Sequence, residues 1–126
     1  MDNCIFCKIA NNEIPSSKIY EDEQVVSFLD IAPANKGHAL ILPKQHFETY
    51  LDIPDEVIHS LNTSIKKVIK AQSQTLGNKG YNIVMNNHKV AGQVVPHAHI
   101  HVIPRFENDR LVLNWRTLTY KDKESE

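Results

Sequence analysis

Histidine alternates with small or branched apolar residues in the stretch HAHIHVI, which covers residues 97–103. Successive side chains of a β-strand point to opposite faces of a sheet. A strand over these residues would therefore place the three histidines (His97, His99 and His101) and Ile103 on one face, and Ala98, Ile100 and Val102 on the other. The apolar face suits packing under a helix, and we expect the histidine face to line a cleft or to meet solvent. The pattern predicts a half-buried strand, which requires a fold built on a sheet.

These three histidines allow three interpretations. They could be surface residues of a half-buried strand, although chance rarely places three histidines in register next to a Gly-Gln turn. They could bind one metal ion, because the strand spacing lets all three imidazoles act as ligands. They could also supply a nucleophile, whose neighbours fix its tautomer and stabilise charge. The third interpretation is the one that the pattern favours.

The rest of the chain predicts a single α+β domain over residues 1–126. Apolar spacing predicts a short helix within residues 4–12 and a long helix that Pro54 opens and Gly77 ends. Short apolar runs predict four further strands, at residues 19–20, 25–29, 38–42 and 81–85. Because short turns join neighbouring strands, we expect a five-stranded antiparallel sheet with the long helix on one face.

Composition excludes several classes of protein. The 126 residues are 41% hydrophobic and 23% charged with a net charge of −1, which is typical of a globular domain and not of a nucleic-acid or membrane-surface binder. No apolar run reaches the roughly 18 residues of a membrane-spanning helix, and the N-terminus lacks the features of a signal peptide. We therefore expect a cytoplasmic protein that binds neither nucleic acid nor membrane, with a flexible tail at residues 121–126.

Both cysteines lie in one short motif, Cys4-Ile5-Phe6-Cys7. A pair at this spacing fits an intracellular metal or redox site better than a secreted disulfide framework. It provides half of a tetrahedral zinc site and needs two more ligands. A redox motif is disfavoured because no preceding strand opens into this helix, and two small buried thiols that pack as hydrophobes are the remaining alternative.

The stretch HAHIHVI resembles the histidine triad (HIT) motif, His-x-His-x-His followed by two apolar residues. Four other stretches resemble the Hint branch of that family: residues 6–22, 28–46, 80–87 and 92–97. The resemblance runs from about residue 4 to residue 105 and leaves 106–126 as a C-terminal segment. It implies a two-fold homodimer whose two five-stranded sheets join across the interface. It also implies a nucleotide hydrolase or transferase.

The resemblance implies a role for four histidines. His99 would attack the α-phosphorus of a nucleotide to form a nucleotidyl-histidine, from which water releases the nucleoside monophosphate. His101 would contact the phosphate and protonate the leaving group, His97 would orient the nucleophile, and His38 would be the fourth active-site histidine. The best-matched substrate is an adenosine 5′-phosphoramidate, with purines preferred. A dinucleoside polyphosphate hydrolase and a nucleotide-binding regulatory module with slow chemistry are the alternatives.

The same resemblance implies a nucleotide site and a structural zinc. Asp30 would bind the ribose hydroxyls beside Ile31, although the residues alone allow Asp30 to be a turn acceptor. The base pocket would consist of apolar residues that could equally be core: Ile5, Phe6, Ile9, Ile14 and Phe28. The phosphate would contact Asn86, Gly92, Gln93 and Val94. The zinc ligands would be Cys4, Cys7, His46 and His97.

The family resemblance does not account for two features of the sequence. Val94 stands where the family commonly has Ser or Thr, so a side-chain hydroxyl for the phosphate is missing. The C-terminal segment contains the only tryptophan, Trp115. We expect this segment either to cover the active site of the partner subunit or to pack on the sheet, with the first alternative favoured.

Overall fold

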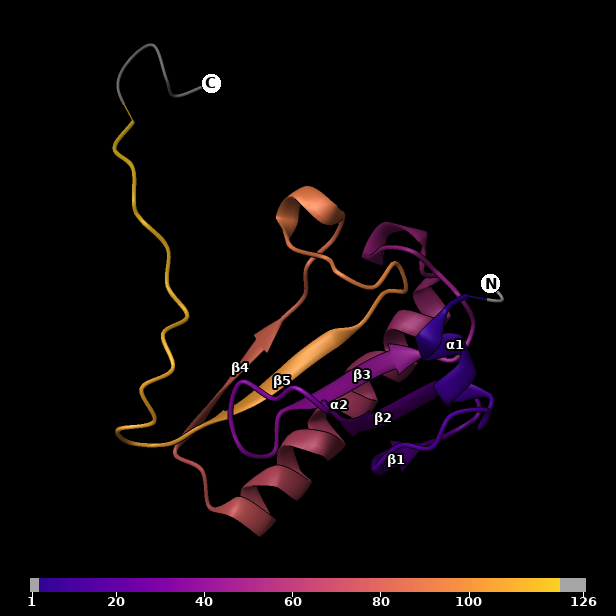
Figure 1. Cartoon of the computed structure of the whole chain (residues 1–126), viewed down its shortest axis with the longest axis horizontal. Coiled ribbons are helices and arrows are strands. Elements are labelled where there is room, and N and C mark those ends of the chain that lie inside the picture. The colour runs from indigo at the N-terminus through magenta and orange to yellow at the C-terminus, as the bar shows by residue number, and fades with distance from the viewer. Residues whose placement is uncertain (1–2, 121–126) are drawn as a thin grey trace.

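The computed structural model describes residues 3–120, so the flexible tail expected at 121–126 lies outside the described residues. Seven regular elements and two short 3-10 turns follow one another (Figure 1). In chain order they are α1 (Ile5–Ala10), β1 (Lys18–Glu21), β2 (Val25–Leu29), β3 (Ala39–Pro43), η1 (Tyr50–Asp52), α2 (Asp55–Leu76), β4 (Gly80–Val84), η2 (Lys89–Ala91) and β5 (Ile100–Arg105).

The five strands form one antiparallel sheet in the order β1-β2-β3-β5-β4. The predicted α+β class, the five antiparallel strands, the long helix and the short N-terminal helix are all confirmed. His101 lies on β5, an interior strand of the sheet, opposite Leu40 of β3 on one side and opposite Val84 of the edge strand β4 on the other. This interior position ties the last histidine of the triad to two strands at once.

Helix α2 covers one face of the sheet. Pro54 is its N-cap in an extended conformation, and Gly77 ends it in the left-handed conformation (φ 63°), as predicted. The buried face of the helix recurs every three or four residues, as the period of an α-helix requires, and consists of Val57, Leu61, Ser64, Val68 and Gln72. The last of these is polar, and its Nε2 donates to the carbonyl oxygens of Gly37 and Val102.

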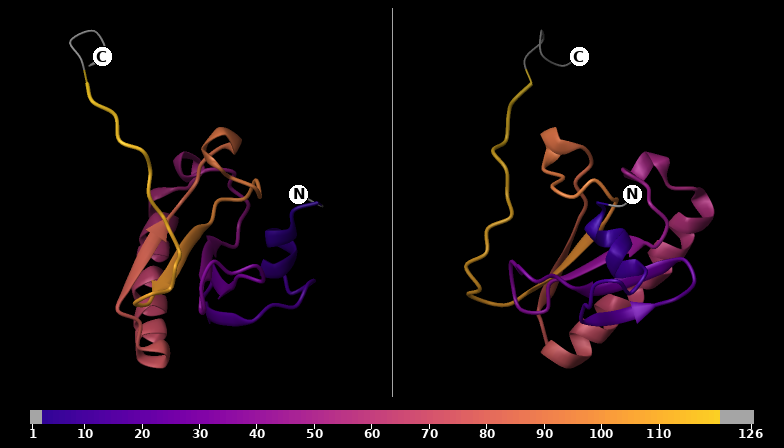
Figure 2. Two further views of the ribbon diagram at one scale, coloured as in Figure 1. Left: turned by 60° about the vertical axis from the view of Figure 1, so that its left-hand side comes forward. Right: turned by 45° about the vertical axis from the view of Figure 1, so that its right-hand side comes forward.

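Helix α1 covers part of the opposite face, so the sheet lies between two unequal helical layers (Figure 2). Phe6, Ile9 and Ala10 of α1 pack against β2 and β3 through residues that include Phe28 and Leu40. Because β2 and β3 contact a helix on each face, nearly all of their side chains are buried. The short helix is thereby fixed next to the strands that carry the candidate site.

Strand β5 begins at Ile100, whereas the alternation predicted a strand from His97. The ladder with β3 ends where Ile41 pairs with Ile100. Beyond it Pro43 has no N–H to donate, and its carbonyl oxygen accepts from His97 Nε2 at 2.8 Å. The histidine face is also less open than expected, since His97 is 0% and His99 only 8% exposed.

The end of the described chain, residues 112–120, is exposed and forms neither helix nor strand. It runs away from the sheet and helices (Figure 1). Trp115 is 83% exposed, so the expected alternative in which this segment packs on its own sheet is wrong.

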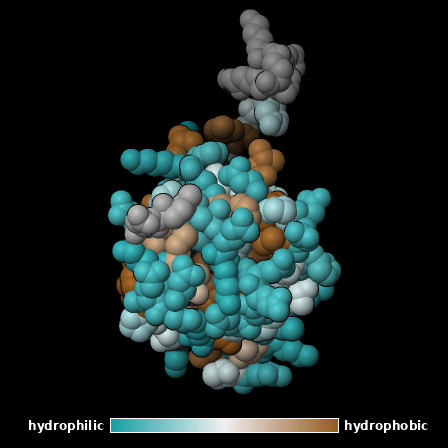
Figure 3. All heavy atoms as spheres, turned by 90° about the vertical axis from the view of Figure 1, so that its right-hand side faces the viewer, coloured by the Kyte–Doolittle hydropathy of each residue, from teal (hydrophilic) through white to brown (hydrophobic). Residues whose placement is uncertain are grey.

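None of the helices within residues 3–120 combines the length and apolar character that a bilayer crossing requires. The side of the molecule that carries the N-terminus is mostly hydrophilic, with small separate hydrophobic patches (Figure 3).

Candidate functional site

A cleft of about 490 Å³ opens between α1, the end of β2 and the segment that precedes β5. His99 and His101 line it, and Asp30 lies at the end of β2. The structure brings ten of the eleven predicted nucleotide-binding residues to this cleft: Ile5, Phe6, Ile9, Ile14, Phe28, Asp30, Ile31, Asn86, Gly92 and Val94. Residues far apart in the sequence therefore form one mostly apolar hollow with imidazoles on its wall.

The wall next to the imidazoles is aromatic. The Phe6 ring meets the His99 ring edge to face at a centroid distance of 4.9 Å and the Phe28 ring at 5.8 Å. Asp30 Oδ1 accepts from the Ala32 N–H at 2.9 Å. Asp30 Oδ2 is 3.7 Å from His38 Nε2 and keeps acceptor capacity for a ligand. The cleft thus combines a flat apolar wall with one carboxylate.

The tautomer of His99 is fixed by a backbone carbonyl. Its Nδ1 lies 2.7 Å from the carbonyl oxygen of His97. A carbonyl oxygen only accepts hydrogen bonds, so the ring proton is on Nδ1 and Nε2 carries a lone pair. Burial lowers the pKa of His99, which keeps the ring neutral near pH 7. His99 therefore presents an unprotonated nitrogen, which is what a nucleophile needs.

The tautomers of His38 and His101 are fixed by N–H groups that donate to their Nδ1 atoms. The Ala34 N–H donates to His38 Nδ1 at 2.9 Å, so the proton of neutral His38 is on Nε2. His38 Nε2–H donates to His101 Nδ1 at 2.9 Å, which places the proton of His101 on its Nε2. Burial lowers the pKa of His101 to about 4. Two neighbouring imidazoles of the cleft thus carry opposite tautomers, one with a lone pair on Nε2 that can attack and one with an Nε2–H that can donate a hydrogen bond.

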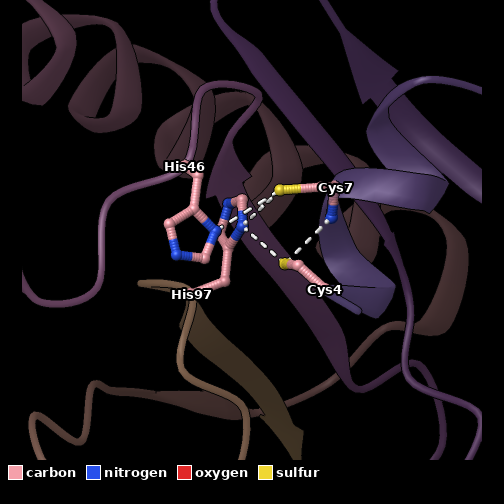
Figure 4. Close-up of side chains that lie close together, drawn as sticks. All are labelled: Cys4, Cys7, His46 and His97. Carbon is pink, nitrogen blue, oxygen red and sulfur yellow. Dashed lines mark hydrogen bonds between the residues drawn. The ribbon is translucent and has the colours of Figure 1, made fainter. Parts of the chain in front are cut away.

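Four side chains gather on the other side of His99, at the junction of α1, the segment after β3 and the segment before β5 (Figure 4). They are Cys4, Cys7, His46 and His97. His97 Nδ1 is 3.3 Å from Cys4 Sγ and 3.5 Å from Cys7 Sγ, and His46 Nδ1 is 3.4 Å from Cys7 Sγ. All the ligand atoms lie within 4.8 Å of one another, so this group could hold a metal ion.

Residues 11–108 match the family model described as HIT domain. The chain belongs to the HIT family. An uncharacterized HIT-like protein of Methanocaldococcus jannaschii is 50% identical over 112 residues, which cover 89% of this chain and 86% of the relative. The adenosine 5′-monophosphoramidase of Saccharomyces cerevisiae is 44% identical over 113 residues, which cover 89% of this chain and 69% of the relative.

Solved structures of the HIT family share this fold. A member from Bacillus subtilis matches with a TM-score of 0.89 at 40% identity, covering 97% of this chain and 89% of that chain. A Zn-bound histidine triad family protein from Mycobacterium smegmatis matches with a TM-score of 0.83 at 37% identity, covering 88% and 81%.

This HIT protein contains a second group with metal-ligand types, Asp30, His38 and His101. The hydrogen bonds argue against a metal there, because His38 Nδ1 accepts from the Ala34 N–H and Nε2 carries the ring proton. His97 differs, since its Nε2–H donates to the Pro43 carbonyl and its Nδ1 lone pair faces the cysteines. Within residues 3–120, only the Cys4 group combines metal-ligand types with free lone pairs.

Gln93 is the one predicted nucleotide-binding residue that does not line the cleft. Its side chain is turned inward, where Nε2 donates to the carbonyl oxygens of Glu48 and Val95 and Oε1 accepts from the His88 N–H. Its backbone N–H is also engaged, by the His88 carbonyl. The expected phosphate contact through this amide is thus corrected: Gln93 holds the loop that presents Gly92 and Val94 to the cleft.

Sequence reasoning predicts that a carbonyl holds Nδ1–H of His99, but it does not identify which groups set the tautomers of the histidines. These groups are the Ala34 N–H and the carbonyl oxygens of Pro43 and His97. Every residue has a carbonyl and nearly every residue has an N–H, so no residue type marks them. Pro43 alone left a signal, because a proline at the end of a strand cannot continue the ladder.

Proposed function

We propose that this protein is a nucleotide hydrolase or transferase that releases AMP from adenosine 5′-phosphoramidates through a nucleotidyl-histidine. The observation that carries the proposal is the bare Nε2 of His99 beside the protonated Nε2 of His101 on the wall of one cleft. The name of the yeast relative, an adenosine 5′-monophosphoramidase at 44% identity, supports this substrate class.

The reaction proceeds in two balanced steps. His99 Nε2 forms a bond to the α-phosphorus while the bond from phosphorus to the amine breaks. His101 Nε2–H donates a hydrogen bond to the departing nitrogen, which takes its proton from solvent water. A water molecule then attacks the same phosphorus, its proton passes to solvent, and the bond between His99 Nε2 and phosphorus breaks to release AMP. Burial favours the neutral state of both rings, which leaves the His99 Nε2 lone pair free to attack and keeps His101 Nε2–H as a hydrogen-bond donor.

The remaining residues of the cleft bind the nucleotide. The apolar wall that includes Phe6 and Phe28 takes the adenine ring, and Asp30 accepts from the ribose hydroxyls. Asn86 and the backbone N–H of Val94 contact the phosphate, whereas the Gly92 N–H donates to the Lys89 carbonyl at 3.0 Å and Gly92 serves by letting the backbone come close. The φ of Gly92 is 100°, which favours glycine, and Asn86 lies against this glycine, so the backbone and this amide reach the phosphate from the same side.

A structural zinc ion bound by Cys4, Cys7, His46 and His97 is part of this proposal. With zinc bonds of about 2.3 Å to sulfur and about 2.0 Å to nitrogen, tetrahedral coordination separates S and N by about 3.5 Å. The measured separations of 3.3 to 3.5 Å fit this value. Bound zinc would supply cross-linking between α1 and the segments around it, and the Pro43 carbonyl already orients His97 for it.

The last part of the proposed function is that the protein forms a homodimer. Strand β4 lies at an edge of the sheet, and Tyr81 and Ile83 on it are 50% and 52% exposed. An edge strand carries unpaired N–H and C=O groups that a second copy can pair with. The exposed segment 112–120 is then free to reach the partner subunit, because it makes no packing contact that buries it on its own chain.

The test is AMP release from adenosine 5′-phosphoramidate by wild type, His99→Ala and His59→Ala. His59 is an exposed histidine of α2 and serves as the matched control. Loss of the nucleophile should lower kcat at least about a thousandfold, while His59→Ala keeps wild-type turnover. Equal turnover by wild type and His99→Ala would refute the mechanism. If wild type binds AMP but releases none, dinucleoside polyphosphates and then a binding role without chemistry become the explanations.

A further inference from the structure

Asp109 lies just beyond the end of β5, and its carboxylate joins three segments of the chain. Its Oδ2 accepts from Asn35 Nδ2 at 2.8 Å, from Arg105 Nε at 2.8 Å and from the Phe106 N–H at 2.9 Å. Its Oδ1 accepts from Arg105 Nη2 at 3.0 Å and from the Leu111 N–H at 3.1 Å. The side chain is 9% exposed, so these bonds are largely shielded from water. The family match ends at residue 108, just before this aspartate.

The turn that carries Asp109 is strained. Asn108 and Arg110 on either side of it have φ values of 64° and 65°. Non-glycine residues adopt this left-handed region at a cost of about 1 to 3 kcal/mol, and they persist where the surroundings determine them strongly. Two such residues in three positions indicate that the turn is held by the bonds to the carboxylate.

Asn35 connects this turn to the active site. Its side chain donates both to Asp109 and to the Pro104 carbonyl of β5. Its own carbonyl accepts from the His38 N–H at 3.1 Å. The preceding residue, Ala34, donates its N–H to His38 Nδ1. The loop between β2 and β3 therefore closes on both the backbone and the ring of His38, and its anchor is the Asp109 carboxylate.

Resting on the proposed function, we propose that Asp109 is a positioning residue for the His38–His101 pair. Through Asn35 it holds the Ala34 N–H against His38 Nδ1, so that the proton of His101 stays on Nε2, where it can donate a hydrogen bond to the leaving group. Arg105 holds the pKa of Asp109 well below its usual range, so this carboxylate is ionised near neutral pH.

The experiment compares wild type with Asp109→Asn and Asn35→Ala on two substrates. Adenosine 5′-phosphoramidate needs a proton on its leaving nitrogen, whereas the 4-nitrophenyl ester of AMP releases a phenolate that needs none. A hydrogen bond to a leaving group that gains charge contributes about ten- to a hundredfold to the rate. Its partial loss should therefore lower kcat for the phosphoramidate about tenfold and for the ester less than about twofold. KM should change less than about twofold for both.

A second readout follows the tautomers directly. Long-range ¹H–¹⁵N spectra of histidine-labelled full-length protein distinguish a ring protonated on Nε2 from one protonated on Nδ1. We expect only the Nε2–H form of His38 and His101 in wild type, and a mixture in both variants. Asn35→Ala leaves the Arg105–Asp109 ion pair in place, so this variant can still test the proposal if Asp109→Asn folds poorly.

Asp22→Asn is the matched control, because Asp22 also accepts several hydrogen bonds in a turn, from the Gln24 and Val25 N–H groups and the Tyr20 hydroxyl. It should lower stability without changing the substrate ratio or the tautomers. Equal loss of kcat on both substrates, or unchanged tautomers in both variants, would overturn the inference. Failure of wild type on both substrates would instead reject the proposed function, and the spectra alone would then decide the role of Asp109.

Discussion

His38 donates a hydrogen bond to His101: the distance from His38 Nε2 to His101 Nδ1 is 2.9 Å, and the ring centroids are 5.1 Å apart. The strands that carry them are paired, because Leu40 of β3 lies opposite His101 of β5. A donor arrangement of this kind requires both rings to be neutral. It links the acid–base state of the cleft to the stability of the fold.

Stability should fall as the pH is lowered from about 6.5 to about 4, the ordinary and the folded pKa of His101. Burial lowers this pKa, so in that window the unfolded chain binds a proton that the folded chain excludes, and unfolding is favoured. His101→Gln should make the decline shallower. Denaturant unfolding at pH 7 and pH 5 measures it, and an identical pH slope in the two metal-loaded proteins would contradict the assignment.

Metal removal should weaken nucleotide binding as well as stability. Cys7 and Phe6 are neighbours on α1, one in the metal group and one on the wall of the cleft. A metal at about a thousand times its Kd contributes about 4 kcal/mol to the free energy of unfolding. We expect chelation or Cys7→Ser to lower Tm, remove about one equivalent of zinc and raise the Kd for AMP.

Thermal melts, metal analysis and AMP titration of the same samples check this coupling. Leu61→Ala offers a control that lowers stability from the far face of the sheet, since Leu61 is 1% exposed on α2. It should leave the Kd for AMP unchanged. Unaltered AMP binding in chelated protein would separate the metal group from the cleft.

The proposed contact between Asp30 and the ribose predicts discrimination against deoxynucleotides. A hydrogen bond to a charged group contributes about 1.5 to 3 kcal/mol, so wild type should bind AMP about ten- to a hundredfold more tightly than the analogue that lacks the contacted hydroxyl. Asp30→Asn should remove most of this difference. Calorimetry with AMP, 2′-deoxy-AMP and 3′-deoxy-AMP measures the ratios, and the same preference in both proteins would show that Asp30 does not contact the sugar.

The exposed edge of β4 predicts how the proposed homodimer can be disrupted. Ile83→Lys places a charge on the exposed edge of the sheet and should convert a dimer into a monomer, seen by sedimentation or light scattering. Glu13→Lys adds a lysine after α1, away from β4, and should leave the mass unchanged. If the Ile83 variant kept twice the mass of one chain, the interface would lie elsewhere.

The fold could be predicted from the sequence because each helix and strand has its own local sequence signals. Helix α2 has an apolar period, Pro54 at its start and Gly77 at its end, and all three features were found where expected. The start of β5 was mispredicted because alternation ignores the partner strand, where Pro43 interrupts the ladder. The predicted nucleotide residues collect at one cleft except Gln93, whose amide satisfies backbone groups inside its own loop.

The network around the histidines was outside the reach of the sequence. Asn35 and Asp109 are 74 residues apart, and neither stands in a motif. Ala34 acts through its backbone N–H, which almost any residue would provide. Only the folded chain shows that these atoms meet.

His97 divides its two functional groups between two sites: its side chain faces the cysteines, and its carbonyl oxygen holds the proton of His99. A codon change can delete the imidazole, but it leaves the carbonyl in the chain. The group that orients the His99 ring is therefore shielded from point mutation and can be lost only by moving the backbone. A substitution at position 97 can remove a ligand of the proposed metal site and still leave the proposed nucleophile with its tautomer fixed.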